Sequence, residues 1–309
     1  MTETQTFAGL PAAALDALEG AAVAILGADH GSPYAPGTAS HAAGGAAAIR
    51  AGSALFAKQL TQVDFDIGGT LRQGPEDRVV VDAGDLALDL ADSVANRAAI
   101  TAAVGRVLDA GAVPVILGGD DSVPIPVFAA YEGRGPVAML QVDAHVDWGD
   151  VIQGNPFGYG SPMRRAAEMP WFGEMVQVGI RGLGSGTADQ HADAHAYGSR
   201  IFTMDAVERD RVEAAAVALP EGGDVFLSID LDGMEPTAMP AVNMPTPGGL
   251  TYREILRLVR GVAARRRIVG VAIVEFVPAK DRDGLAAVTA ARLALSVAGI
   301  IAGQKQPAR

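Results

Sequence analysis

The chain has 309 residues, of which 49% are hydrophobic, and a formal net charge of −12 at pH 7. This acidic balance argues against a nucleic-acid partner, which would need a basic face, and suits a cationic ligand. The absence of cysteine excludes disulfides, thiolate catalysis and cysteine-bound zinc. Since no basic residue precedes Arg50 and no run of about 18 apolar residues occurs, we expect no targeting peptide, no membrane span and a cytoplasmic location.

Short apolar runs alternate with alanine-rich stretches along the chain and predict an α/β fold. The strand candidates are apolar throughout, which is typical of strands buried on both faces of a mainly parallel sheet. No linker or repeat divides the chain, so we expect one domain over residues 1–309. The expected strands lie at 21–29, 78–85, 112–121, 135–145, 174–180, 199–204, 224–232 and 268–276, and the expected helices at 93–110, 205–217, 251–265 and 284–301.

Two segments, 30–44 and 145–165, are rich in glycine, proline and serine, which predicts loops. Open parallel sheets bind ligands at the carboxyl ends of their strands. We therefore expect these loops to border a site whose chemistry is supplied by residues at the strand ends.

The stretch GGDDS, residues 118–122, ends the third expected strand with two adjacent aspartates, Asp120 and Asp121. Either could cap the helix that should follow, or hold a cation. A phosphate site is a weaker interpretation, because two carboxylates repel phosphate and no lysine follows the glycines.

The stretch DAHVD follows the fourth expected strand and contains Asp143, His145 and Asp147. Alternate residues of a strand project to one face, so we expect these three side chains to point the same way. Burying two carboxylates there without a cation would be costly, which favours a metal site over a chance match.

Two later strand ends are also acidic. Asp230 and Asp232 lie two positions apart after VFLSI, where a capped turn is the alternative interpretation. Glu275 in VEFVP ends the last expected strand, where pairing with a structural arginine is the alternative.

Together these strand ends supply carboxylates and one imidazole, donors suited to hard or borderline divalent ions. Two ions would offset this much negative charge better than one. A two-metal site also lowers the pKa of a shared water from about 15.7 toward neutrality, which predicts metal-assisted hydrolysis. The expected metal ligands are Asp121, Asp143, His145, Asp147, Asp230 and Asp232.

These motifs, in this order, resemble the signatures of the ureohydrolase family, which comprises arginases, agmatinases and guanidino-acid hydrolases. The likeness covers GGDDS, DAHVD, SIDLDGMEP and VEFVP, and extends over nearly the whole chain; YGSPMRRA and MPAVNMPTPGGLTY are most similar to bacterial agmatinase-like members. The resemblance implies a three-layer α/β/α fold with a mainly parallel eight-stranded sheet. It also implies two divalent ions, Mn²⁺ or in some relatives Ni²⁺, and hydrolysis of a guanidino group to urea and an amine.

The resemblance further implies how the six expected ligands divide. Two carboxylates would bridge both ions, and two further ligands would complete the shell of each. By position, Asp143 and Asp230 are the bridging pair, Asp121 and Asp147 belong to one ion, and His145 and Asp232 belong to the other.

Beyond the metal ligands, the resemblance implies that Glu275 binds the cationic guanidinium group and orients its carbon. Asp147 would also direct the attacking hydroxide. Family members are commonly trimers or hexamers, so we expect a homo-oligomer.

Three positions depart from the family pattern, the mildest being Glu235, which replaces the usual aspartate before Pro236. Asp121 stands where the family usually has histidine, and Tyr159 where it usually has the histidine of a His-Gly pair. Five carboxylates around two dications leave a net charge of −1, which should hold a guanidinium more tightly but make the shared water less acidic. Tyr159, in the catalytic position for proton delivery to the leaving amine, is a poorer shuttle at neutral pH than imidazole. A second hypothesis therefore stays open: a weakly active or inactive subunit that supports a catalytic paralogue in a hetero-oligomer.

The sequence constrains the substrate less. The loop 148–160 has no anchor for an α-carboxylate, so we do not expect arginine; agmatine, a guanidino acid, guanidine, and a substituted guanidine or biguanide remain. Arg164 is a candidate for binding a carboxylated guanidine, or it faces solvent or a neighbouring subunit. Trp148 is a candidate wall for an alkyl group, or it packs the loop. His30 and His41 are candidate substrate contacts at the rim.

Overall fold

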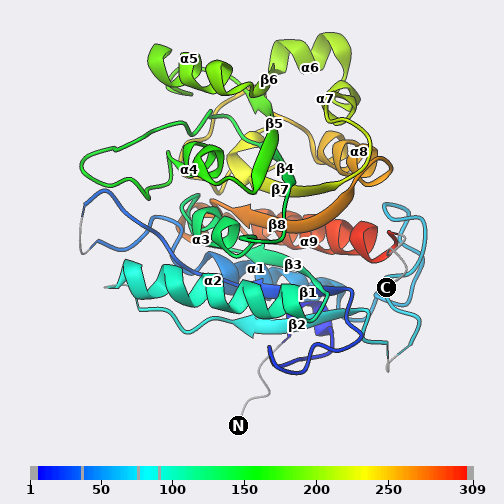
Figure 1. The fold of residues 1–309 in the computed structure, drawn as a ribbon. Coiled ribbons are helices and arrows are strands. Elements are labelled where there is room, and N and C mark those ends of the chain that lie inside the picture. The colour runs from blue at the N-terminus through cyan, green and yellow to red at the C-terminus, as the bar shows by residue number, and fades with distance from the viewer. Residues whose placement is uncertain (1–5, 36–37, 75–76, 90–91, 305–309) are drawn as a thin grey trace.

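The computed structural model describes residues 6–35, 38–74, 77–89 and 92–304. Its centre is an eight-stranded sheet in which all neighbouring strands are parallel, in the order β2-β1-β3-β8-β7-β4-β5-β6 (Figure 1). The expected strands are confirmed, and the sheet is wholly parallel. The strands are β1 (Val23–Gly27), β2 (Val80–Asp85), β3 (Val113–Leu117), β4 (Val137–Val142), β5 (Phe172–Ile180), β6 (Arg200–Thr203), β7 (Asp224–Asp230) and β8 (Arg267–Val274).

The strands are apolar throughout because both faces of the sheet are covered. Every residue of β1 and β4 is buried. Consecutive residues of a strand point to opposite faces, so Ile25 lies in one hydrophobic core and Leu26 in the other. The edge strand β6 is only partly buried.

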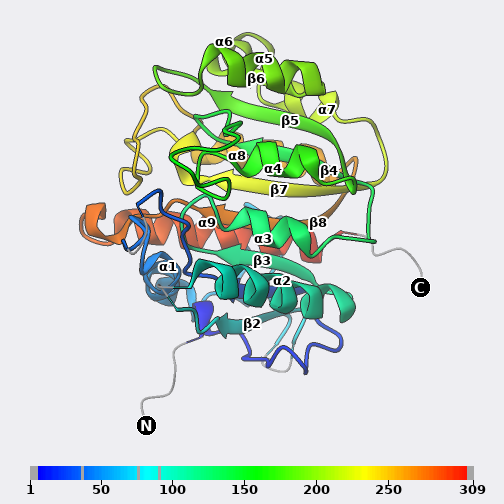
Figure 2. The same ribbon diagram turned by 60° about the vertical axis from the view of Figure 1, so that its left-hand side comes forward.

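Helices on the two faces of the sheet make the three layers of the molecule (Figures 1 and 2). The helices α1, α7, α8 and α9 enclose the core that contains Ile25, and α2, α3 and α4 enclose the core that contains Leu26. The bounds are α1 (Gly45–Ser53), α2 (Ser93–Asp109), α3 (Pro124–Ala129), α4 (Pro162–Glu168), α5 (Ala188–Tyr197), α6 (Met204–Asp210), α7 (Glu213–Ala218), α8 (Tyr252–Ala263) and α9 (Leu285–Ala302), with 3₁₀ turns at Phe7–Gly9, Ala54–Phe56, Leu231–Gly233 and Pro278–Lys280.

The expected helices at 93–110, 251–265 and 284–301 are confirmed as α2, α8 and α9. The start of α8 is fixed by a capping box, in which the side chains of Thr251 and Glu254 bind each other's backbone N–H. The single helix expected at 205–217 is wrong: it is divided into α6 and α7 at Arg211, whose φ of 67° is left-handed and cannot continue a helix.

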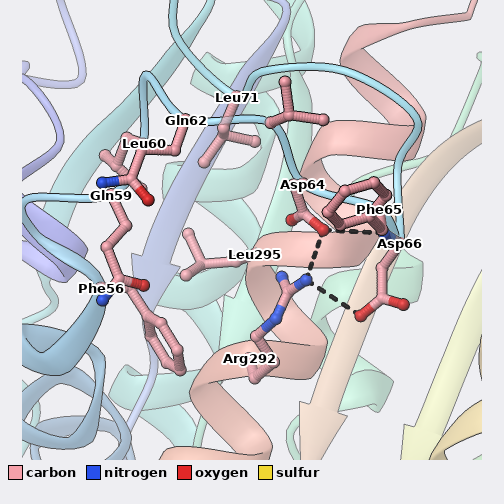
Figure 3. Close-up of a pocket in the computed structure, with 11 residues that line it drawn as sticks. Phe56, Gln59, Leu60, Gln62, Asp64, Phe65, Asp66, Leu71, Arg292 and Leu295 are labelled. Atoms are coloured by element: carbon pink, nitrogen blue, oxygen red, sulfur yellow. Dashed lines mark hydrogen bonds and ion pairs between the residues drawn. The ribbon is translucent and has the colours of Figure 1, made fainter.

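α9 is long and apolar enough to cross a membrane by composition, with a mean hydropathy of 1.9. In the structure it packs against α1 and α8, and 61% of it is buried, so its composition is explained by the core that it fills. The segment 56–71 packs on its outer side. There Arg292 of α9 contacts the carboxylates of Asp64 and Asp66 at 2.6 and 2.9 Å (Figure 3).

Candidate metal centre

The four acidic strand ends lie side by side. β3, β8, β7 and β4 are consecutive in the sheet and all parallel, so their carboxyl ends meet at one edge (Figure 2). Asp121 and Glu275 are 154 positions apart in the sequence, yet the backbone N–H of Asp121 donates to Glu275 Oε1 at 2.9 Å. The topology thus gathers the motifs that the sequence analysis identified separately.

Two glycines make the sharp turn after β3. Gly118 and Gly119 have φ angles of 87° and 73°, in the left-handed region. A Cβ on Gly118 would lie 2.4 Å from the backbone nitrogen of Ala46, and one on Gly119 would lie 2.4 Å from the backbone oxygen of His30. Only glycine allows the chain to turn this closely beneath α1 and deliver the two aspartates that follow.

The two aspartates of GGDDS have different contacts. Asp120 accepts hydrogen bonds from Ser40 Oγ at 2.7 Å and from Ser122 Oγ at 2.5 Å, which anchors the segment before α1 to the end of β3. Asp121 instead lines the pocket over the strand ends. Asp120 Oδ1 also accepts the backbone N–H of Ser122 at 3.1 Å in the turn before α3, whereas Asp121 accepts no backbone N–H of the described residues, so helix capping does not explain Asp121.

Asp143, His145 and Asp147 lie beyond the last residue of β4, Val142. Their convergence therefore comes from a turn, which corrects the expectation that strand alternation aligns them. Asp143 Oδ1 accepts the backbone N–H of His145 at 2.6 Å, and Asp147 has a left-handed φ of 46°. His145 Nδ1 lies 3.3 Å from Asp143 Oδ1 and 3.2 Å from Asp232 Oδ2.

A buried chain of amides supports this turn. Gln141 Nε2 donates to Asp143 Oδ2 and to Asp147 Oδ2, each at 2.7 Å. Gln141 Oε1 accepts from Gln177 Nε2 at 2.6 Å, and Ser199 Oγ donates to Gln177 at 2.8 Å. These residues were not predicted from the sequence, although a glutamine between two valines or between a leucine and a valine, as in β5 and β4, was a usable signal.

Asp230 ends β7, and Asp232 lies in the 3₁₀ turn that follows. Asp230 Oδ1 accepts the backbone N–H of Asp232 at 2.7 Å, and Asp232 Oδ1 accepts that of Ala144 at 3.2 Å. These bonds tie the end of β7 to the turn after β4. Arg181 donates to the backbone oxygens of Asp232 and Met234, at 2.8 and 3.1 Å, and so secures the turn from outside.

The six expected ligands come together, and two groups of three have donor atoms within 4.8 Å of one another. Asp143 belongs to both groups, as a bridging ligand would, whereas Asp230, the other expected bridging ligand, belongs to one. The sixth expected ligand, Asp147, belongs to neither group and is hydrogen-bonded to Gln141. The groups are Asp143, His145 and Asp232, and Asp121, Asp143 and Asp230.

Burial and mutual repulsion act on these groups. Burial first, and then the charges of neighbouring carboxylates, raise the pKa values of four aspartates well above the ordinary value. Burial opposes protonation of His145, but the hydrogen bond to Asp232 and the charges of Asp232, Asp147 and Glu275 together outweigh burial and raise the pKa of His145 to about 9. The cluster therefore needs positive charge, from protons or from cations. The four aspartates are Asp121, Asp143, Asp147 and Asp230.

Asp121 shows most directly that the cluster fits cations. Both its carboxylate oxygens are buried, and among the described residues neither has a hydrogen-bond donor; the side chain that approaches is the carboxyl group of Asp147, which can pair with Asp121 only by sharing a proton. Such a carboxylate is strongly unfavourable unless a cation pairs with it. Asp64 and Asp66 differ from Asp121 in this respect, because each forms an ion pair with Arg292 of α9 (Figure 3).

The cluster lines a pocket of about 170 Å³ whose walls include Tyr34, Ile152, Tyr159 and Met244. The ring centroids of Tyr34 and Tyr159 are 4.6 Å apart. Within the ranges that the structure describes, no lysine or arginine lines this pocket. Tyr159 thus lies in the pocket, as expected. Tyr34 and Ile152 come from the two loops that were expected to border the site, but nothing in the sequence singles out these residues, and Met244 comes from a distant segment.

Glu275 also lines the pocket, and its other contact is with His41. His41 Nε2 lies 2.6 Å from Glu275 Oε2. Glu275 is therefore in contact with a histidine and not with the structural arginine of the alternative interpretation. His30, the other expected rim residue, is buried instead and lies 3.2 Å from Asn96.

Two candidate substrate contacts, Arg164 and Trp148, are not among the residues that line this pocket. Arg164, on α4, is ion-paired with Glu168 at 2.9 Å and with Asp193 at 3.0 Å, because α4 turns it toward α5. Trp148 is only 3% exposed and packs against the ring of Tyr197 at 5.6 Å. Arg164 therefore forms ion pairs within α4 and with α5, and Trp148 packs its loop against α5, in agreement with the alternative interpretations of the two residues.

Comparison with known proteins agrees with the geometry, since residues 21–299 match the pattern of the arginase family. The chain belongs to the arginase family. Over 231 residues it is 33% identical to the mitochondrial arginase of Medicago truncatula, covering 72% of this chain and 67% of that protein. Over 230 residues it is 29% identical to the guanidinobutyrase of Pseudomonas aeruginosa, covering 72% of each. Its fold is similar to that of a proclavaminate amidino hydrolase from Streptomyces clavuligerus, with a TM-score of 0.80, 28% identity, and coverage of 97% and 98%.

Family membership confirms the predicted arginase-like fold and the enzyme class, an amidinohydrolase acting on linear amidines. In this ureohydrolase, the binuclear metal site of the arginase family corresponds to the acidic cluster at the strand ends. Two of the three departures from the family pattern, Asp121 and Tyr159, line the pocket, so they bear directly on its chemistry.

Proposed function

We propose that this ureohydrolase cleaves the C–N bond of a small substituted guanidine to give urea and an amine, using two divalent ions held by the acidic cluster. The observation that carries the proposal is the buried carboxylate of Asp121, which has no hydrogen-bond donor among the described residues and lies beside the other candidate ligands. Mn²⁺ is the first candidate, because five of the six proposed donors are carboxylates, and Ni²⁺ is the second.

Each residue of the pocket has a separate role in the proposed reaction. When bound, the ions would lower the pKa of a water and supply hydroxide near neutral pH. Glu275 would receive the guanidinium group through charge-assisted hydrogen bonds. Asp147, held by Gln141, would accept a hydrogen bond from the nucleophile and fix its direction. Burial and then the charge of Glu275 raise the pKa of Tyr159, so its phenol stays protonated, donates to the leaving amine and regains its proton from water.

The walls of the pocket favour an uncharged substituent on the guanidine. Because no described lysine or arginine lines the pocket, the carboxylate of a guanidino acid would find no counter-charge there. The rings of Tyr34 and Tyr159 offer an apolar wall and attract a delocalised cation. With a volume of about 170 Å³, the pocket suits a short alkyl group.

The test is urea release by protein loaded with Mn²⁺ or with Ni²⁺. The substrates are guanidine, short N-alkylguanidines, a biguanide, agmatine and a guanidino acid. We expect the highest kcat/KM for an N-alkylguanidine and the lowest for the guanidino acid. Glu275→Gln keeps all the proposed ligands and should lower kcat/KM by about a hundredfold or more. A preference for the guanidino acid would contradict the substrate assignment, and no urea from any of these compounds would contradict the hydrolase proposal.

A second candidate function rests on Asp121 and Tyr159, which stand where the family usually has histidines. The alternative is an inactive subunit that assembles with a catalytic paralogue. The double variant Asp121→His, Tyr159→His separates the two proposals. Urea release by the variant but not by the wild-type chain would favour the supporting subunit, and release by the wild type would exclude it. A homo-oligomer, three or six chains, remains our proposal for the catalytic form, and light scattering measures it.

A further inference from the structure

His41 makes the shortest contact to the residue assigned to the guanidinium group. Its Nε2 lies 2.6 Å from Glu275 Oε2, while the backbone N–H of Asp121 donates to Oε1 at 2.9 Å. Each carboxylate oxygen of Glu275 therefore has one protein partner. The backbone of Glu275 is also constrained, with a left-handed φ of 67° and an N–H that donates to Gly119 O at 2.9 Å.

The position of His41 is itself fixed from both sides. Its neighbour Ser40 donates to Asp120 at 2.7 Å, and the backbone N–H of Gly44 donates to Asp29 Oδ2 at 2.6 Å. The His41 ring meets the ring of Tyr159 edge to face, with centroids 5.1 Å apart. Asp120, the first aspartate of GGDDS, therefore has a structural role: it anchors the segment that carries His41.

We propose that His41 is a positioning residue for substrate binding: from Nε2 it donates to Glu275 Oε2 and holds the carboxylate in the orientation that receives the guanidinium group. The proposal rests on the assignment of Glu275 as the guanidinium-binding residue. With one donor on each oxygen, the remaining lone pairs of Glu275 are left for the two N–H groups of a guanidinium.

The charge of His41 decides how strongly Glu275 attracts the substrate. A neutral imidazole leaves the full charge of Glu275 to the guanidinium, whereas an imidazolium cancels that charge and repels the substrate. Burial opposes protonation of His41, but the hydrogen bond and charge of Glu275 outweigh it and raise the pKa of His41. Of the other charged groups that face the ring, Asp120 acts in the same direction and Lys280 in the opposite one. KM should therefore fall as pH rises through a pKa above the ordinary value of about 6.5.

The first test needs neither ion nor substrate. The chain has five histidines, so isotope-labelled histidine gives few NMR signals, and His41→Gln assigns one of them to His41. We expect the midpoint of that signal to lie above the ordinary value in the wild type and to fall in Glu275→Gln, where the carboxylate charge is gone. An identical midpoint in both proteins would overturn the contact. This titration tests the contact on which the proposal depends even if the wild type releases no urea, a result that would count against the proposed function alone.

The second test is kinetic. His41→Ala removes the donor and should raise KM about ten- to a hundredfold with kcat little changed. His41→Gln keeps an N–H donor, so its KM should rise less, and the pH dependence of KM above about 6.5 should be lost. His191→Ala, an exposed histidine on α5, is the matched control and should leave KM unchanged. A wild-type KM and pH profile in His41→Ala would overturn the positioning role.

Discussion

The surroundings of Asp121 suit a metal ligand. They do not suit an aspartate with a purely structural role, which would accept hydrogen bonds from the protein. The turn at Gly118 and Gly119 buries it, and both its carboxylate oxygens lack a hydrogen-bond donor in the described part of the chain. Asp120, its neighbour, is satisfied by two serines. Asp120 therefore anchors the turn, while Asp121 is left free to bind a metal ion. A single aspartate at this turn could not do both.

This placement predicts opposite effects for Asp121→Asn with and without ions. In metal-free protein, removing an unpaired buried charge should stabilise the fold by about 1 kcal/mol or more, because that charge costs free energy in the folded state. With Mn²⁺ present, the variant should gain less stability than the wild type, since one ligand is weakened. Thermal melting measures both. Asp16→Asn, which changes an exposed carboxylate near the amino terminus, is the control and should change neither melt.

If Asp121→Asn lowered the melting temperature of metal-free protein, the carboxylate would have an energetic role that the structure does not contain. An equal response of variant and wild type to Mn²⁺ would remove Asp121 from the ligand set.

At the scale of elements, the strands were predictable because continuous apolar runs mark strands buried on both faces. The site followed from them, because parallel strands present their carboxyl ends at one edge. What failed depended on contacts between distant segments. Nothing in the sequence pairs His41 with Glu275 or Arg164 with Asp193, and no glycine or proline marks the break at Arg211. The side-chain directions in DAHVD were attributed to a strand that ends one residue earlier.

The packing of α1 on β2 depends on one buried cation. Arg50 of α1 contacts Asp82 and Asp85 of β2, the second at 2.6 Å, and Arg50 is only 8% exposed. Arg50→Ala should lower the free energy of unfolding by about 3–5 kcal/mol, because it leaves the buried charge of Asp82 without a cation, held by backbone N–H groups alone. Urea denaturation measures this. Arg209→Ala, which removes an exposed arginine paired with its neighbour Asp210, should change it by less than about 0.5 kcal/mol, and an equal effect of the two variants would contradict this role.

At the scale of the whole molecule, the acidic cluster couples stability to pH. An aspartate whose pKa is raised in the folded state above its unfolded value of about 3.9 penalises folding increasingly as pH rises past that value. His145, with its pKa raised to about 9, stabilises the fold below about 6.5 and loses that contribution as pH rises through about 9. Both effects have the same sign.

Metal-free protein should therefore melt at progressively lower temperature as pH rises from about 5 toward 9. With Mn²⁺ the trend should weaken or reverse, because deprotonated ligands bind the ion better. Calorimetry across this range, with and without the ion, measures the difference. A metal-free melting temperature that is flat or rises over this interval would show that the carboxylates are satisfied without cations.

The most direct measurement is the metal content of the chain itself. Protein expressed with Mn²⁺ available, purified without chelator and freed of loose ions should carry two ions per chain by mass spectrometry. Asp143→Ala, which removes the carboxylate shared by both groups of candidate ligands, should carry far fewer. A wild-type chain that carries no ion, whether Mn²⁺ or Ni²⁺ is supplied, would contradict the account that these side chains converge to hold a pair of dications.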